Sequence, residues 1–166
     1  MTEHDHAPAP ITFAIITCSD TRGMKQDTAG AALEQLIADN GWVCKNHVVV
    51  KDEVPQISAA IVEACDTIDA DIVLTCGGSG LSLRDVTPEA TQAVCDRNVP
   101  GIAEAIRATS LQKTRRAMLS RAVAGTRGNT LILNVPGSEK AARENLGAVV
   151  GTLEHAMRMI AAEGHG

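Results

Sequence analysis

The most constraining feature of this sequence is an apolar run that leads into a glycine-rich turn and then into a helix start. Residues 72–74, Ile-Val-Leu, have the length and β-branching of a buried strand. The turn after them contains Gly77, Gly78, Ser79 and Gly80. Because glycines carry no side chains, the backbone N–H groups of such a turn can close around an anion. Residues 87–89, Thr-Pro-Glu, suit an N-cap, a first helical position and the positive helix end.

This succession of strand, glycine turn and helix start predicts a phosphate-binding loop at the carboxyl end of a sheet. Arg84 and Asp85 lie between the turn and the helix. An arginine can clamp a phosphate group, and a carboxylate can hold a magnesium ion. A tight loop that carries a surface ion pair is the alternative interpretation. The charged pair together with the capped helix favours the phosphate site.

The composition indicates a single α/β domain. The chain has 166 residues, enough for a substantial core. Hydrophobic residues make up 45% of it and aromatic residues only 1%, so the core must be aliphatic. Branched runs alternate with alanine-rich stretches, as in proteins whose parallel strands are buried on both faces. The predicted fold class is therefore α/β, a single three-layer domain with a mainly parallel sheet flanked by helices.

Charge and cysteine usage narrow the classes of function. The net charge is −5 and the basic residues are scattered, so no nucleic-acid partner is expected and local donors must hold an anionic substrate. The five cysteines are widely spaced, and four of them predict small buried hydrophobes. Cys76 enters the glycine turn, where loop packing is favoured over a nucleophilic role. The histidines lack metal-ligand spacing. No signal peptide or membrane-length apolar run is present, so no membrane partner and a cytoplasmic location are expected.

The order of elements follows from the periodicity of apolar residues. Residues 1–10 predict a disordered N-terminal lead-in, and residues 11–163 predict the folded domain. Strands are predicted at residues 11–17, 42–50, 71–75 and 130–134. Helices are predicted at residues 28–40, 55–67, 88–97, 101–112 and from 138 onward, with an extended, bent segment at 117–128. Thr28 and Thr87 are the expected caps of two of these helices.

The loops that leave the four predicted strands are all polar. They comprise residues 19–28, 51–53, 77–85 and 134–138. Ligands of parallel sheets bind at the carboxyl ends of the strands. If the strands are parallel, the four loops meet at one rim and form one site. Ordinary solvated connections are the alternative.

These motifs together resemble the MoaB/Mog family of molybdenum cofactor biosynthesis proteins, which includes the G domain of gephyrin. The resemblance covers residues 11–158, and its motifs are Ser19-Asp20, Asp27-Thr28-Ala29-Gly30, residues 76–80, Arg84-Asp85, residues 87–90, residues 100–104 with Arg107, and residues 134–141. The chain departs from the family pattern at Cys76, Ser79, Ile102 and Glu139. Ser79 keeps a hydroxyl for phosphate binding, whereas Cys76 and Glu139 are positions where the grip on the substrate can differ.

The resemblance implies that the protein adenylylates molybdopterin with magnesium-ATP, giving adenylyl-molybdopterin and pyrophosphate. It implies catalytic roles for Asp52, Asp85 and Arg84, with Asp52 and Asp85 as Mg²⁺ ligands. The implied nucleotide- and phosphate-binding residues are Ser19, Asp20, Asp27, Gly77, Gly78, Ser79 and Gly80. The implied molybdopterin-binding residues are Asn134, Pro136, Gly137, Ser138 and Lys140. For each of these residues, a capping or surface role is the alternative.

Two other functions stay open. One is a noncatalytic member that binds molybdopterin or a nucleotide. The other is an interaction scaffold like gephyrin, which the lack of an additional domain or long linker disfavours. Noncatalytic members tend to lose the Arg-Asp pair, so Arg84-Asp85 favours an active enzyme. The resemblance also implies a homo-trimer or homo-hexamer, and it leaves open a molybdenum or a tungsten pathway.

Overall fold

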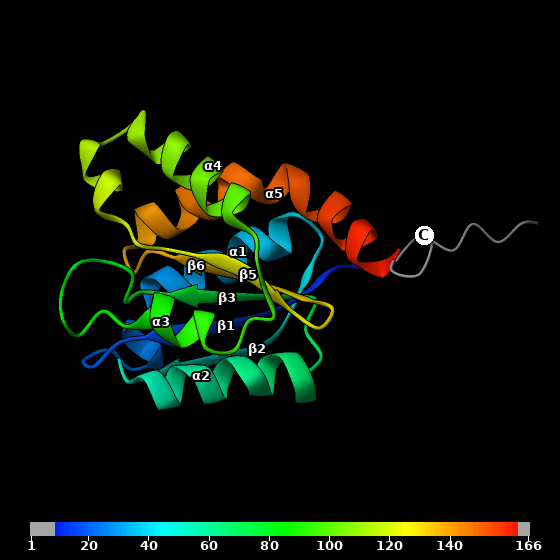
Figure 1. Cartoon of the computed structure of the whole chain (residues 1–166), viewed down its shortest axis with the longest axis horizontal. Helices are drawn as coiled ribbons and strands as arrows, with labels where there is room; N and C mark the ends of the chain where they lie inside the picture. The colour runs from blue at the N-terminus through cyan, green and yellow to red at the C-terminus, as the bar shows by residue number, and fades with distance from the viewer. Residues whose placement is uncertain (1–8, 163–166) are drawn as a thin grey trace, which may run out of the picture.

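A computed structural model of the chain describes residues 9–162, with a six-stranded sheet as its middle layer (Figure 1). The predicted lead-in, apart from its last two residues, and the predicted boundary at residue 163 lie outside the described residues. The strand order is β2-β1-β3-β6-β5-β4. The strands are β1 (Thr12–Cys18), β2 (Val43–Val50), β3 (Ile72–Cys76), β4 (Arg97–Asn98), β5 (Ala124–Arg127) and β6 (Thr130–Val135).

Four neighbouring strands, β2, β1, β3 and β6, run parallel, and β5 and β4 continue the sheet in antiparallel pairing. The strands β1, β3 and β6 are buried over nearly their whole length. This burial explains their continuous apolar runs, because helices cover both faces of the sheet. The predicted α/β fold with a mainly parallel sheet is confirmed.

The helices lie on the two faces of the sheet. They are α1 (Thr28–Asp39), α2 (Val54–Val62), α3 (Thr87–Gln92), α4 (Pro100–Leu111) and α5 (Glu139–Ala161). Figure 1 shows α4 and α5 on one side of the sheet and α2 on the other. Alternate residues of β1 serve the two cores: Phe13 and Ile15 pack with residues of α1, α4 and α5, whereas Ala14 and Ile16 pack with residues of α2 and α3.

Three shorter turns complete the chain: η1 (Met24–Gln26), η2 (Glu63–Thr67) and η3 (Arg115–Leu119). The helix predicted at residues 55–67 divides into α2 and the π-turn η2. The helix predicted at 88–97 is too long, because α3 ends at Gln92 and residues 97–98 pair with β5 instead. The segment predicted as extended at 117–128 is partly wrong, because η3 occupies its start and β5 begins only at Ala124.

Both predicted threonine caps are wrong. Asp27 caps α1, since its carboxylate accepts a hydrogen bond from the Gly30 N–H at 2.9 Å. Thr87 lies inside the first turn of α3, and its buried hydroxyl donates to Gly77 O at 2.8 Å. This threonine therefore secures the glycine turn. Ser138, in contrast, caps α5 as expected from the predicted helix start, by accepting from the Ala141 N–H at 3.3 Å.

No helix within residues 9–162 combines the length and the apolar character needed to cross a bilayer.

Candidate active site

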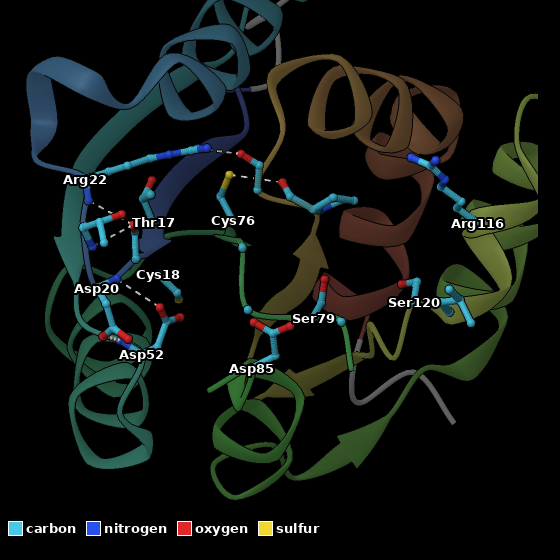
Figure 2. Close-up of a pocket in the computed structure, with 18 residues that line it drawn as sticks. Thr17, Cys18, Asp20, Arg22, Asp52, Cys76, Ser79, Asp85, Arg116 and Ser120 are labelled. Carbon is cyan, nitrogen blue, oxygen red and sulfur yellow. Dashed lines mark hydrogen bonds between the residues drawn. The ribbon is translucent and has the colours of Figure 1, made fainter. Parts of the chain in front are cut away.

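One cavity of about 560 Å³ opens where the parallel strands end, and loops from all four strands line it (Figure 2). The strand ends and the loops after them contribute residues 17–22 at β1, Asp52 after β2, residues 76–80 with Asp85 at β3, and residues 136–137 after β6. A further wall comes from Arg116, Leu119 and Ser120, in and just after η3. The prediction that four polar loops share one rim is confirmed.

The segment between β3 and α3, residues 77–85, we call the glycine loop. Gly77 and Gly78 have φ angles of 100° and 70°, which side-chain-bearing residues rarely adopt. A Cβ on Gly77 would lie 2.6 Å from Cys18 O, and one on Gly78 would lie 2.3 Å from Thr87 Oγ1. Glycine is therefore required at both positions by conformation and by space. The Thr87 N–H also donates to Gly78 O at 3.1 Å, which closes the turn onto α3.

Asp52 brings an unpaired carboxylate oxygen into the site. Its Oδ2 accepts from the Asp20 N–H at 3.0 Å, and Asp20 Oδ1 accepts from the Asp52 N–H at 3.1 Å. Its Oδ1 is buried and has no hydrogen-bond partner. Burial, followed by the nearby charges of Asp20 and Asp85, raises the pKa of Asp52. An orphaned acceptor among like charges favours a cation or a donor from a ligand.

Asp85 lies on the same side of the cavity as Asp52 in Figure 2. Its Oδ2 accepts from the Ser82 N–H at 3.3 Å. A Cβ added to Gly80 would lie only 2.9 Å from this Oδ2. The carboxylate thus packs directly against the glycine turn.

Arg84 joins three loops at the surface but does not line the cavity. Its Nε donates to Asp20 Oδ2 at 3.0 Å, and its Nη2 donates to Glu53 Oε1 at 2.9 Å. The Arg84 guanidinium is the main reason why the pKa of Asp20 is lowered. Asp20 and Ser19 themselves line the cavity beside Asp52.

Asp27 lies behind the cavity wall and is only 3% exposed. Its carboxylate accepts from the Thr17 hydroxyl and lies 2.7 Å from His47 Nε2, in addition to its cap bond to Gly30. A Cβ on Gly30 would overlap both Asp27 and His47, which explains the glycine in this motif. Thr17 lines the cavity. The structure thus places Asp27 one residue removed from the cavity surface.

Some of the predicted molybdopterin-binding residues line the cavity, and the others lie behind or outside its lining. Pro136 and Gly137 line the cavity, whereas Ser138 and Lys140 are exposed outside its lining. Asn134 is buried at 1% exposure. Its Nδ2 donates to Thr75 Oγ1 at 2.7 Å and to Thr91 Oγ1 at 2.9 Å. Asn134 therefore ties β6 to β3 and α3.

Cys18 and Cys76 lie in the cavity wall as protonated thiols. Burial is the main cause that raises the pKa of each to about 12. The Cys76 Sγ donates to Pro136 O at 3.3 Å. A thiol that holds its proton at neutral pH is a poor nucleophile, so loop packing describes Cys76, as expected from its sequence position.

Sequence reasoning missed the two arginines of the cavity, Arg22 and Arg116. Figure 2 shows them on opposite sides of it, with Arg22 on the left and Arg116 on the right. Arg22 Nη1 donates to Gly137 O at 2.8 Å, which links the loop after β1 to the loop after β6. Arg22 lies in a polar loop already predicted to border the site, so its charge was a usable signal. Arg116 had none, because η3 follows no predicted strand.

Fold and site define an α/β protein with a cavity and a glycine turn at the carboxyl edge of a mainly parallel sheet. Residues 14–155 match the family described as "Probable molybdopterin binding domain", and the chain belongs to this family. It is 36% identical over 154 residues to a molybdopterin adenylyltransferase of Helicobacter pylori, covering 90% of this chain and 88% of that protein. The predicted resemblance is confirmed.

Further relatives agree in sequence and in structure. The chain is 38% identical over 146 residues to the molybdenum cofactor biosynthesis protein B of Bacillus cereus, covering 86% of each protein. The crystal structure of the molybdopterin biosynthesis enzyme MoaB from Thermus thermophilus superimposes with a TM-score of 0.85 at 44% identity. That match covers 92% of this chain and 98% of the other. The family places the protein in molybdenum cofactor biosynthesis.

Proposed function

We propose that this protein is a molybdopterin adenylyltransferase, which transfers the adenylyl group of magnesium-ATP to molybdopterin and releases pyrophosphate. The observation that carries the proposal is the partnerless buried oxygen of Asp52 in the same cavity as the glycine turn. One feature suits a cation and the other suits phosphates. The activity for which the Helicobacter pylori relative is named supports the same reaction.

Asp52 and Asp85 are the residues that would hold Mg²⁺. Within residues 9–162, no group of three or more acidic, histidine or cysteine side chains is arranged to bind a metal. Two carboxylates fit magnesium well, because it keeps several non-protein ligands such as water and phosphate oxygens. When bound, Mg²⁺ would neutralise charge on the phosphates during transfer. The unpaired Oδ1 of Asp52 is the oxygen atom that fits the role of a magnesium ligand.

The nucleotide half of the site would consist of the glycine loop, with Ser19 and Asp20 facing it from the loop after β1. The protein's contribution to phosphoryl-group chemistry is mostly positioning and electrostatic stabilisation. Backbone N–H groups of residues 78–80 would hold the phosphates, because the Gly77 N–H already donates to Val135 O at 3.0 Å. Arg84 would act through Asp20, which it pairs with, because it does not line the cavity. Asp27 would support this half through Thr17.

The molybdopterin half would lie at the loop after β6. Pro136 and Gly137 line the cavity there, and Ser138 caps the following helix. The terminal phosphate of molybdopterin would be favoured near this helix start, where free N–H groups and the helix dipole attract anions. Lys140 would add a positive charge at the rim. Asn134 would support the loop from below through its bonds to Thr75 and Thr91.

The test is pyrophosphate release by the purified protein with molybdopterin, Mg²⁺ and ATP. We expect release that needs all three components and yields adenylyl-molybdopterin by mass spectrometry. Binding of both substrates without pyrophosphate would instead identify the noncatalytic alternative. A protein that binds neither would contradict the proposal altogether.

The two halves can be separated with the double variant Ser138→Ala with Lys140→Ala. We expect molybdopterin affinity to fall, because a charge and a cap are lost, and ATP affinity to stay within about twofold of wild type. The single variant Lys113→Ala removes an exposed lysine elsewhere and serves as the control. Equal losses of both affinities would contradict the two-part site.

We propose further that the protein works in the cytoplasm as a homo-trimer or homo-hexamer. The family resemblance supports this assembly. Light scattering of the purified protein would distinguish the two states, and a monomeric mass would contradict both.

A further inference from the structure

Arg121 contacts the glycine loop from outside the cavity. It follows η3 and does not line the cavity. Its Nε donates to Gly80 O at 2.7 Å, and its Nη2 donates to Asp85 O at 2.7 Å. Its backbone N–H donates to Ser79 O at 2.8 Å. One residue therefore holds three carbonyl groups of the loop.

These bonds set the direction of the loop's N–H groups. A peptide unit is planar, so the C=O of one residue and the N–H of the next point in opposite directions. Holding Ser79 O and Gly80 O against Arg121 therefore turns the N–H groups of Gly80 and Leu81 away from Arg121. A glycine turn without such bonds would have to be ordered by its ligand, which costs affinity.

The same residue also places Asp85. The bond from Nη2 fixes the Asp85 carbonyl, and the Asp85 carboxylate packs against Gly80, which the Nε bond fixes. The distance between a proposed magnesium ligand and the turn that would bind phosphate thus depends on one guanidinium. The planar fork of arginine suits this task, because a lysine cannot donate in two fixed directions.

Arg121 is itself anchored on two helices. Its guanidinium forms an ion pair with Glu89 in the first turn of α3. Arg107 on α4 donates from Nη1 to Ala122 O at 2.7 Å, the carbonyl just after Arg121. Because Glu89 balances its charge, Arg121 supplies directed donors to the loop rather than a net positive field.

We propose that Arg121 is a positioning residue of this enzyme, which holds the glycine loop and Asp85 in the arrangement that binds magnesium-ATP. The inference rests on the proposed function for its ligand, and on the hydrogen bonds of Arg121 for its mechanism. Because Arg121 does not line the cavity, it acts through the loop and not on the substrate.

The test compares Arg121→Lys with the matched control Arg127→Lys. Arg127 on β5 makes the same kinds of contact away from the cavity, with two donors to Asp66 and one, Nη1, to Val94 O at 3.0 Å. The two side chains are similarly exposed, at 35% and 28%. A purely structural role predicts similar effects of the two substitutions.

Three measurements are made on the folded variants. The first is NMR amide exchange at Asp85 and Thr87, whose N–H groups donate to Ser82 O and Gly78 O inside the loop. The second is the calorimetric Kd for magnesium-ATP, and the third is kcat in the pyrophosphate assay. We expect Arg121→Lys to speed both amide exchanges and to raise the Kd for magnesium-ATP by about tenfold. We expect kcat to fall by up to about 100-fold. Arg127→Lys should change each by less than about twofold.

Unchanged loop exchange and unchanged Kd in Arg121→Lys would overturn the inference, as would equal effects in Arg127→Lys. If the wild-type protein does not bind magnesium-ATP, the proposed function fails, and amide exchange alone then decides the role of Arg121. If Arg121→Lys does not fold, Glu89→Ala replaces it, because it frees the guanidinium on the α3 side. We expect faster loop exchange in that variant too, and unchanged exchange would overturn the inference.

Discussion

Asp27 and Asp52 are acids beside the same cavity, but their carboxylates differ in how fully they are hydrogen-bonded. Asp27 is fully buried and has three polar partners, Thr17, His47 and the Gly30 N–H. Asp52 is partly exposed, and one of its oxygens is buried with no partner at all. A buried polar atom without a hydrogen bond lowers the free energy of unfolding. The fold therefore bears a stability cost at Asp52 that is absent at Asp27.

This difference separates two kinds of aspartate. We call Asp27 a framework residue, because its bonds hold the fold together, and Asp52 a site residue, because it keeps a free oxygen in the cavity. The framework acid holds β1, β2 and the start of α1 together with every bond made. The site acid keeps bonding capacity for a ligand. Asn134 and Ser79 show that the division extends beyond acids, since Asn134 is fully bonded below the cavity and Ser79 lines it.

The strongest test of the framework half is Asp27→Ala. Removing the carboxylate leaves Thr17, His47 and the Gly30 N–H without this partner. At about 1–3 kcal/mol for each buried group left unsatisfied, we expect a loss of about 3–5 kcal/mol of unfolding free energy. Urea denaturation measures this loss. Asp39→Ala is the control, because Asp39 is exposed on the same helix and only accepts from Gln35 Nε2. A loss below about 1 kcal/mol would show that Asp27 is not a framework residue.

The corresponding test of the site half is Asp52→Asn. Loss of one preorganised electrostatic group costs about 10²–10³ in turnover, which the pyrophosphate assay measures. Glu63→Gln removes an exposed acid that does not line the cavity and is the control. Near wild-type turnover in Asp52→Asn would remove Asp52 from the mechanism.

The same variant also tests the pKa of Asp52. Because its folded pKa is raised, wild-type stability falls as the pH rises from the ordinary aspartate value through the folded pKa. Asparagine has no such penalty. We therefore expect Asp52→Asn to unfold at a higher temperature than wild type at neutral pH, with the difference vanishing in acid. A lower midpoint at neutral pH would contradict the assignment.

Gly78→Ala tests the turn that joins framework and site. Its Cβ would press on Thr87 Oγ1 at 2.3 Å, in addition to the cost of a positive φ. We expect a stability loss of about 1–3 kcal/mol together with weakened ATP binding. Gly41→Ala is the control, since Gly41 has a φ of 76° but open space around its Cβ. If both variants lose equal stability and bind ATP normally, packing of the turn does not matter.

The smallest effect on stability is expected from Arg84→Ala at the exposed rim of the site. Arg84 is the first cause of the lowered pKa of Asp20, so that pKa should rise in the variant. A lowered folded pKa stabilises above the unfolded value, and this stability disappears as the pH falls through the folded pKa. The pair is exposed, so thermal unfolding should barely change. Carbon NMR of the Asp20 carboxyl during titration measures the shift, and an unchanged pKa would contradict the pairing.

Much of the fold was predictable because its signals are local. The apolar runs of β1, β3 and β6 are continuous, and parallel strands must bring their carboxyl ends to one edge. The four polar loops therefore met as expected. The tight turn at Gly77 and Gly78 was also predictable from the sequence, since few other residues tolerate such a backbone conformation.

The errors concern side chains whose partners lie far along the chain. Thr87 fits a cap by local pattern, but its hydroxyl donates to a carbonyl ten residues earlier. Thr28 is the exception, because the residue directly before it, Asp27, is the cap instead. The contacts of Asn134 and Asp27 reach other strands, so their burial behind the cavity could not be inferred from sequence spacing. Arg121 was missed for the same reason, because the loop that it holds lies about forty residues earlier.

The contact between Gly77 and Gly137 has a consequence for the two substrates. A Cβ on Gly137 would lie 3.2 Å from the Gly77 Cα, so the loop after β3 and the loop after β6 touch backbone to backbone. At this contact, therefore, backbone atoms without side chains form the boundary between the proposed nucleotide and pterin pockets. Reacting atoms must come within about 3–3.5 Å, and a single added methyl group here would act as a spacer that holds them apart.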